Sequence, residues 1–243
     1  MMTDIGTVFW KEQKELLSQK GTRGRLGVLM FVLVFGIFLP LEMGRSWIES
    51  PMVLLYWVWV PLFLVSTVIA DAFAGERERH TLETLLASRL PDRAILLGKM
   101  FGGIGYSWGL TLLSLVLGLV TVNLTHGDGT MLMFSPLVGL AILVLSLLGA
   151  GLAAGTGVVV SLRASTVRQA QQTLSVSILM LLFVPVLGAQ ALPLRWKVSL
   201  VQLFAEMGVT TSVIGAIFAL VLVNLGLFLW ALARFKRARL ILD

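Results

Sequence analysis

The sequence predicts an all-α, polytopic membrane protein with six transmembrane helices. Hydrophobic residues make up 57% of its 243 residues and charged residues only 13%, and its mean hydropathy is +0.93. A soluble domain of this length carries about twice that charged fraction. Several apolar runs exceed the roughly 20 residues that cross a bilayer core. We therefore expect residues 1–243 to form one transmembrane domain embedded in a lipid bilayer.

The net charge, the cysteine content and the first apolar run exclude several other kinds of protein or site. The net charge is +6, but basic residues that orient membrane helices explain this excess, so no nucleic acid partner is expected. The chain has no cysteine, which excludes disulfides and thiolate metal sites. The first apolar run follows a basic segment and lacks a small-residue cleavage pattern, so it is not expected to be a signal peptide.

Six apolar runs are expected to cross the membrane, with boundary errors of a few residues. They cover residues 26–41, 52–70, 100–122, 136–162, 174–192 and 213–233. Of the 19 Lys and Arg residues, all but Arg45, Arg195 and Lys197 fall in segments that this count places on one side. Basic residues accumulate on the cytoplasmic side, so both termini are expected to be cytoplasmic. Trp47 and Trp57 are then expected near the outer interface, where the indole N–H can reach water.

Few polar groups lie within the predicted spans. No Asp, Glu, Lys or Arg falls near the middle of any of them, which argues against a proton-coupled transporter. His80 and His126 are the only histidines, and both lie in predicted loops, which argues against an intramembrane hydrolase. We expect no catalytic, cofactor-binding or metal-binding residue in this chain, and therefore no enzymatic activity of its own.

The N-terminal segment, residues 3–20, is predicted to form an interfacial helix. Ile5, Val8 and Phe9 begin an imperfect apolar stripe, whereas Lys11 and Glu12 belong to the polar side. Such a helix lies along the membrane surface, with Trp10 as its anchor. A frayed tail is the alternative.

Residues 76–88 form a charged island between the second and third predicted spans. Leucines recur at three and four residues, which predicts a short amphipathic helix. Gly75 can end the preceding helix, and Pro91 permits a new one to begin near Asp92. A solvated connector is the alternative, but the leucine stripe favours a cytoplasmic docking helix. Its expected docking residues are Glu76, Arg77, Arg79, His80, Leu82, Glu83, Leu85 and Leu86.

Small residues crowd the fourth predicted span. Gly151 and Gly155 lie four apart, and Gly157 lies four residues after Ala153. This spacing lets helix backbones approach closely, so tight helix packing is expected. A surface that slides during a transport cycle is the alternative.

The segment between the last two spans is expected to form an outer re-entrant or surface-lying helical hairpin. Residues such as Phe204 make it too apolar for a free loop, whereas Lys197 and Glu206 make it too polar to span. The hairpin could cap a translocation path from outside.

Two stretches resemble ABC-2 type transporter permeases. One is Glu76-Arg-Glu-Arg-His-Thr-Leu-Glu-Thr-Leu-Leu followed by Gly98-Lys99, and the other is the start Lys11-Glu12-Gln13-Lys14-Glu15. The six spans and the outer hairpin are also similar to that family. The chain departs from it at His80, where the family usually has Gly, and at Arg89, near the usual Pro.

The resemblance implies a permease subunit without a nucleotide site, paired with a second permease copy or paralogue in the cytoplasmic (inner) membrane. A separate cytoplasmic ABC ATPase dimer would bind ATP and Mg, and residues 76–88 would be its coupling helix. The implied direction is export. The lack of buried charge favours an apolar or amphipathic cargo. The alternative is a non-transporting membrane scaffold that recruits a cytoplasmic partner.

Overall fold

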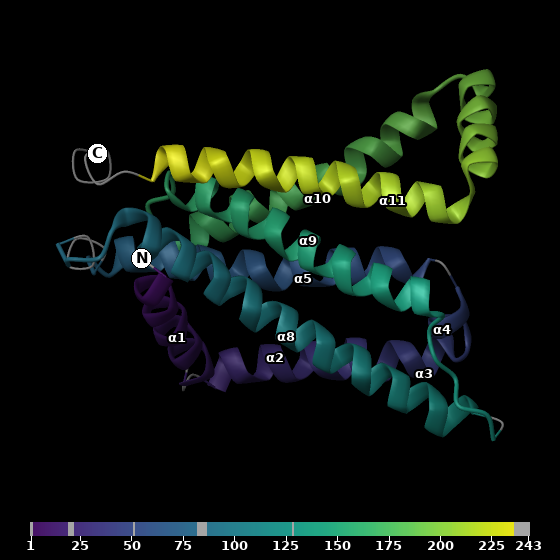
Figure 1. The fold of residues 1–243 in the computed structure, drawn as a ribbon, viewed down its shortest axis with the longest axis horizontal. Helices are drawn as coiled ribbons and strands as arrows, with labels where there is room; N and C mark the ends of the chain where they lie inside the picture. Colours follow the sequence, from purple (N-terminus) through teal and green to yellow (C-terminus); the bar gives the residue numbers. More distant parts are fainter. Residues whose placement is uncertain (1, 19–21, 51, 82–86, 128, 236–243) are drawn as a thin grey trace.

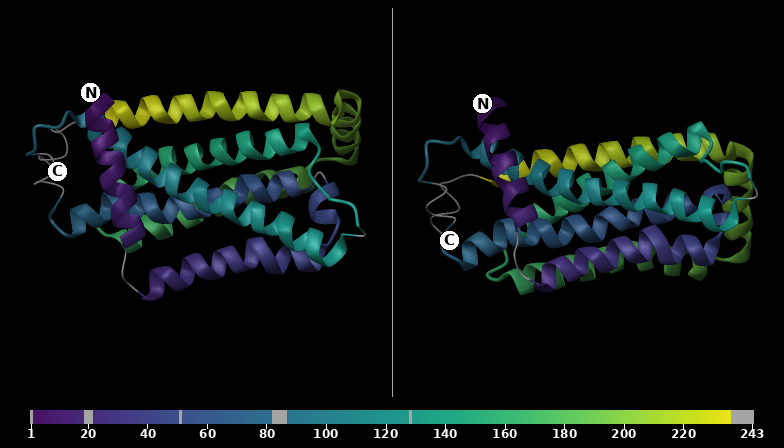
Figure 2. Two further views of the ribbon diagram at one scale, coloured as in Figure 1. Left: turned by 60° about the horizontal axis from the view of Figure 1, so that its bottom comes forward. Right: turned by 90° about the horizontal axis from the view of Figure 1, so that it is seen from below.

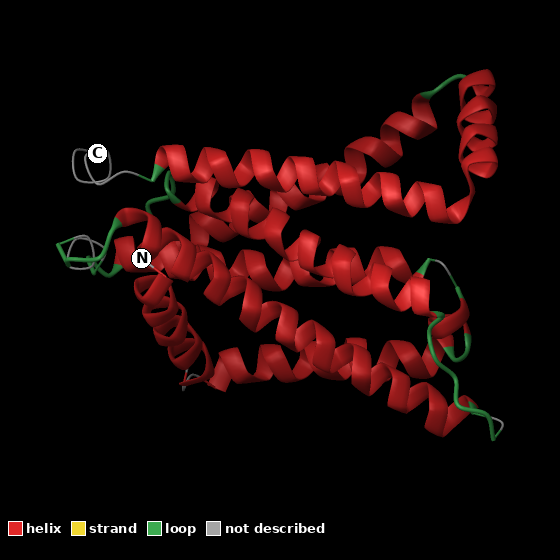
Figure 3. Cartoon of the chain, viewed as in Figure 1, coloured by secondary structure: helices red, strands yellow, loops and turns green. Residues whose placement is uncertain are grey.

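The computed structural model describes residues 2–18, 22–50, 52–81, 87–127 and 129–235, and every regular element in these ranges is helical (Figure 3). In chain order the elements are α1 (Met2–Ser18), α2 (Thr22–Leu33), the π-helical turn η1 (Val34–Phe38), α3 (Leu39–Met43), α4 (Ser46–Glu49), α5 (Val53–Ala70), the π-helical turn η2 (Asp71–Gly75), α6 (Glu76–Glu78), α8 (Asp92–His126), α9 (Pro136–Ser161), α10 (Val167–Ala191) and α11 (Leu194–Arg234).

Five helices in the described residues are long and apolar enough to cross a membrane. They are Leu26–Met43, Val53–Glu78, Asp92–His126, Pro136–Ser161 and Thr210–Arg234. They correspond to the first, second, third, fourth and sixth predicted spans. The predicted fifth span coincides with α10, one continuous helix of 25 residues. The chain is therefore an all-helical, multi-pass membrane protein.

The long helices run along the longest axis of the molecule, and α1 crosses one end of them (Figures 1 and 2). We call this the α6 end, because it also holds α6, the start of α8 and the end of α11. At the centre, α5 packs on α9 because Gly149 lets the backbones meet. A Cβ at Gly149 would lie 2.6 Å from the carbonyl oxygen of Val58. α11 packs on the other side of α9, where Leu227 lies over Gly155.

The second membrane helix is longer than predicted, and the prediction that Gly75 ends it is wrong. The chain stays helical from Val53 through η2 to Glu78. Gly75 has helical dihedrals, with φ −67° and ψ −37°. It is buried, and a Cβ there would lie 2.6 Å from Asp71 Oδ1 and 2.8 Å from Arg79 Nη2. Its missing side chain therefore makes room for two charged neighbours rather than stopping the helix.

Trp47 and Trp57 are not at a wetted surface, contrary to the prediction. Both have an exposed fraction of 0% and lie in one hydrophobic cluster with Val53, Val122 and Ile142. Their ring centroids are 5.6 Å apart in an edge-on arrangement. Neither indole N–H has an acceptor among the described residues. These two rings serve as packing at the end opposite α6.

The helix α1 lies against α8 as well as across the bundle. Gly98 and Gly102 lie four residues apart on α8 and face it. A Cβ at Gly98 would be 2.5 Å from the Val8 Cβ, and one at Gly102 would be 2.8 Å from the Glu12 Cβ. Two small residues at helical spacing thus create the seat for α1. The segment is helical as predicted, and Trp10 is 72% exposed. Its position along the membrane surface stays a prediction.

Candidate coupling site

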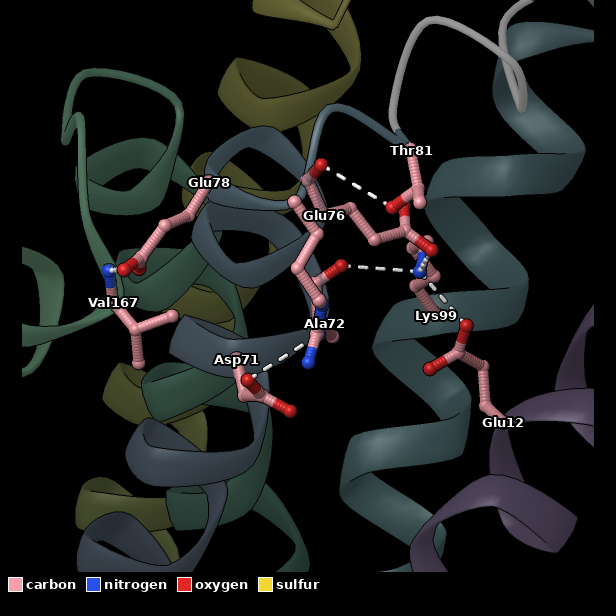
Figure 4. A network of polar contacts seen from close by, with 9 residues as sticks. Glu12, Asp71, Ala72, Glu76, Glu78, Thr81, Lys99 and Val167 are labelled. Carbon is pink, nitrogen blue, oxygen red and sulfur yellow. Dashed lines mark hydrogen bonds and ion pairs between the residues drawn. The ribbon is translucent and has the colours of Figure 1, made fainter.

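A buried lysine joins three elements at the α6 end (Figure 4). Lys99 lies two turns into α8 and is 1% exposed. Its Nζ lies 2.8 Å from Glu12 Oε1 on α1 and 2.9 Å from Glu76 Oε1 on α6. It also donates to the carbonyl oxygen of Ala72 at 3.0 Å. An ammonium has three donors, so all of them are used.

The Lys99 cluster consists of Lys99, Glu12, Glu76 and the carbonyl of Ala72. It is a buried network of ion pairs rather than a surface salt bridge. The side chains of Glu12 and Glu76 are only 7% and 11% exposed. Desolvating such charges is costly, and their pairing has to offset that cost. The cluster is internally saturated except at Glu76 Oε2, which has no partner among the described residues. It therefore holds α1, α6 and α8 in one register.

Sequence reasoning missed this cluster. It placed Lys99 between the second and third predicted spans, Glu76 in the predicted docking helix and Glu12 on the polar side of the N-terminal helix. One signal was available: a helix that begins at Asp92 after Pro91 carries Lys99 to the α8 face that bears Gly98 and Gly102. Glu12 lies four residues after Val8, so both face the same way on α1.

The chain turns sharply after α6. The backbone N–H of His80 donates to the carbonyl of Arg77 at 3.0 Å, and that of Thr81 donates to Glu76 at 2.9 Å. His80 has a φ of 56°. These two bonds and the left-handed residue form a Schellman cap. A continuous helix over 76–88 is therefore wrong in its first part, since the helix ends at Glu78.

Seven of the eight predicted docking residues divide into three groups, and the eighth, Arg77, is described below. Glu76 points inward to Lys99, and Arg79 and His80 are exposed. Arg79 pairs with Asp71 at 3.4 Å, in a surface contact of modest energy. The remaining four lie outside the described residues: Leu82, Glu83, Leu85 and Leu86.

Two other residues of this segment reach toward α10. Glu78 Oε2 accepts from the backbone N–H of Val167 at 2.9 Å (Figure 4). Arg77 Nη1 donates to the carbonyl of Ala164 at 3.4 Å. The short helix α6 thus contacts α8 through Glu76, and the start of α10 through Glu78 and Arg77. A segment with contacts in both directions can pass movement from the α6 end into the membrane helices.

Comparison with known protein families agrees with this arrangement. The family model described as ABC-2 type transporter matches residues 48–198, more than half of the chain. The chain belongs to the ABC-2 type transporter family. It is thus a membrane permease of ABC-2 type, and the resemblance in its sequence is confirmed. A search of curated proteins finds no match to it.

The predicted packing glycines of this ABC-2 permease lie where α9 meets its neighbours. Gly151 faces the Asn224 side chain on α11, which donates to the carbonyl of Leu148 at 3.1 Å. A Cβ at Gly155 would be 2.9 Å from the Leu227 Cβ, and one at Gly157 would be 2.7 Å from Ile69 Cγ2. These distances leave no room for a side chain, so the backbones are in close approach.

The segment between α10 and the last membrane helix is a single helical arm rather than the predicted hairpin. Residues 194–207 form one helix that lies crosswise at the end opposite α6 (Figure 1). The arm turns into the last membrane helix at Gly208, whose φ of 69° and ψ of 163° interrupt α11. Only glycine adopts this conformation readily, which explains the break. Glu206 is exposed on the arm, whereas the side chain of Phe204 lies outside the described residues.

Proposed function

We propose that this chain is the transmembrane permease subunit of an ABC exporter. It moves an apolar or amphipathic cargo outward across the cytoplasmic membrane. A separate cytoplasmic ATPase dimer binds ATP and Mg, and this subunit binds neither. The observation that carries the proposal, within the ABC-2 family, is the Lys99 cluster. It ties the segment that follows α5 to the membrane helices, as a mechanical coupling requires.

The coupling proceeds through contacts rather than through chemistry in this chain. The ATPase docks on Arg77, Arg79 and His80 and on the leucine stripe of residues 82–86. A partner can shift a membrane protein between two states only by contacting one state better than the other. Movement of the docked segment then reaches α5 through continuous helix and reaches α8 and α1 through Lys99.

Six crossings and cytoplasmic termini belong to the same proposal. The last helix begins at the end opposite α6, and its end returns to α6 (Figure 1). There Phe235 meets Phe73 edge-on, with ring centroids 6.0 Å apart. α9 finishes at the α6 end, so α10 connects the two ends. An even number of crossings follows if α10 spans the bilayer. A second permease copy completes the pathway.

The test is to purify the tagged permease from its native membranes with any associated ATPase, and to reconstitute the complex in vesicles. We expect ATP-dependent accumulation of cargo and a co-purified ATPase. In the double variant Glu83→Lys with Leu85→Asp, the rate of cargo accumulation and the amount of co-purified ATPase should each fall by at least tenfold. The control is Glu49→Lys, a charge reversal at an exposed site on α4 at the opposite end.

Two results would contradict the proposal. One is a double variant that keeps the ATPase and transports normally. The other is cargo movement against a gradient by the purified permease without nucleotide. A complex that retains its ATPase but moves no cargo would instead indicate a scaffold.

A further inference from the structure

The first turn of α10 is capped by a residue from a distant part of the chain. Thr166 accepts from the backbone N–H of Gln169 at 3.2 Å, as an ordinary N-cap does. The N–H of Val167 instead donates to Glu78, 89 residues earlier in the sequence. α10 has no acidic residue in its own first turn. A carboxylate stabilises the positive end of a helix, and here α6 supplies it.

Small residues hold the same turn against the end of α5 and against η2. Ala164 and Ala170 are buried with Ala70, Ala74 and Leu174 in one cluster. The carbonyl of Ala164 also accepts from Arg77. The beginning of α10 is thus fixed to η2 and α6 by packing and by two polar contacts.

The far half of α10 is held much less tightly. Val176, Leu179, Met180 and Leu187 are all more than 40% exposed. At 1.5 Å per residue, α10 is about 37 Å long, so a tilt of about 10° at its first turn moves its far end by about 6 Å. A helix that is fixed at its first turn and exposed along its far half can amplify small movements of its anchor.

We propose that Glu78 is a positioning residue that couples the movement of α6 to the tilt of α10. This inference rests on the proposed function, in which the ATPase moves the segment containing α6. Glu76 carries that movement toward α8 and α1 through Lys99. Glu78 carries it in the other direction, to the α10 backbone. One short helix therefore drives two parts of the bundle with two carboxylates, two residues apart.

The experiment measures the tilt directly. The chain has no cysteine, so two spin labels can be placed without removing any native one. Leu137→Cys at the start of α9 and Ala191→Cys at the end of α10 are both exposed. Their distance is measured in the reconstituted transporter complex, without nucleotide and after trapping with ATP and vanadate. In the doubly labelled protein that retains Glu78, the nucleotide-free and the trapped complex should give two distinct distance populations.

Removing the carboxylate should uncouple α10. A helix-end charge changes a two-state equilibrium by a factor of about two to five. Glu78→Ala should therefore lower the nucleotide-induced population by that factor, and Glu78→Gln, which keeps an acceptor, should lower it less. Raising the ionic strength should weaken the coupling with Glu78 but not with Glu78→Gln. Hydrogen exchange at Val167 should accelerate in Glu78→Ala, which verifies that the cap was removed in a folded protein.

The controls separate this inference from the proposed function. Glu15→Ala removes another exposed carboxylate, one paired with Lys11 on α1, and should change nothing. Labels at Met52 and Leu137 report on α5 and α9 and should respond equally in Glu78→Ala and in its parent. An α10 distance that responds fully in Glu78→Ala, or that never responds, overturns the inference. Loss of the ATPase from the parent complex would instead count against the proposed function.

Discussion

At the scale of single residues, the feature with the largest energetic consequence is Lys99. A lysine that is 1% exposed is tolerable because each of its three donors meets an acceptor, one on α1 and two on the helical segment that follows α5. The cluster does not make the protein stable merely by being ionic, since a buried ion pair often contributes little over an apolar replacement. Its value lies in specifying which elements meet, because any other register leaves a buried charge alone.

Lys99→Met should destabilise the protein strongly. The substitution leaves two buried carboxylates without their counter-ion, at a cost of about 3–5 kcal/mol. Thermal unfolding of the purified protein in detergent measures this cost. Adding Glu12→Gln and Glu76→Gln should recover much of it, because the stranded charges are removed. Lys11→Met, which breaks an exposed pair with Glu15, is the control and should cost less than about 0.5 kcal/mol. A mild effect of Lys99→Met would show that the charges of the cluster are not desolvated inside the protein.

His80 is strained where glycine would not be. A left-handed backbone costs a residue with a Cβ roughly 1–2 kcal/mol, a cost that glycine does not have. His80→Gly should therefore stabilise the protein by about 1 kcal/mol in the same unfolding measurement. Arg79→Gly is the matched control, because Arg79 has a φ of −85° and gains nothing from glycine. Equal effects of the two substitutions would contradict the cap geometry.

At the scale of elements, α1 is part of the helix packing and not merely a membrane anchor. An interfacial helix needs only an apolar stripe and a polar face, but α1 also buries Val8 and Glu12 against α8. Helix α6 is three residues long and gains its importance from its position at the end of a continuous helix. A short element can therefore decide how longer ones are arranged.

The seat of α1 predicts a contrast within one helix. Gly98→Leu should push Val8 away and detach α1, because a Cβ there already lies inside contact distance. Such overpacking costs typically 1–3 kcal/mol. Gly109→Leu is the control, since nothing lies within 4 Å of a Cβ at that position of α8. Hydrogen exchange of the α1 amides should accelerate in the first variant and not in the second. The same exchange rates in both would show that α1 is held by other contacts.

At the scale of the whole molecule, the polar ties gather at one end and the aromatic packing at the other. The α6 end carries the Lys99 cluster, the Glu78 contact and the Phe73–Phe235 pair (Figures 1 and 4). The opposite end carries Trp47, Trp57 and the crosswise arm of α11. This asymmetry fits a molecule that receives a force at one end.

The two ends should lie on opposite sides of the membrane. The absence of native cysteine allows single labels at Ser165→Cys, near α6, and at Glu49→Cys on α4, both of them exposed. A membrane-impermeant maleimide added to intact cells should label Glu49→Cys and spare Ser165→Cys, and permeabilisation should expose both. Reversed labelling would overturn the orientation inferred from the basic residues.

Membership in the ABC-2 type transporter family, the helical class and the approximate positions of the membrane helices followed from the sequence alone. The bilayer sets the length of an apolar run that crosses it and the side on which Lys and Arg accumulate. Both features can be recognised in short stretches of sequence. The spacing of the glycines on α9 was visible for the same reason.

Only the tertiary structure decided what the charged residues near the α6 end do. Glu12, Glu76 and Lys99 are far apart in the sequence, and each alone looks like a solvated polar residue. Their burial depends on how far α5 and α8 extend and on α1 crossing at Gly98, which local patterns do not specify. The same is true of Glu78, whose partner is a backbone N–H without any side-chain signature. Long-range pairing of polar groups is a property of the assembled bundle, because the cost of leaving a charge unpaired arises only once the helices exclude water.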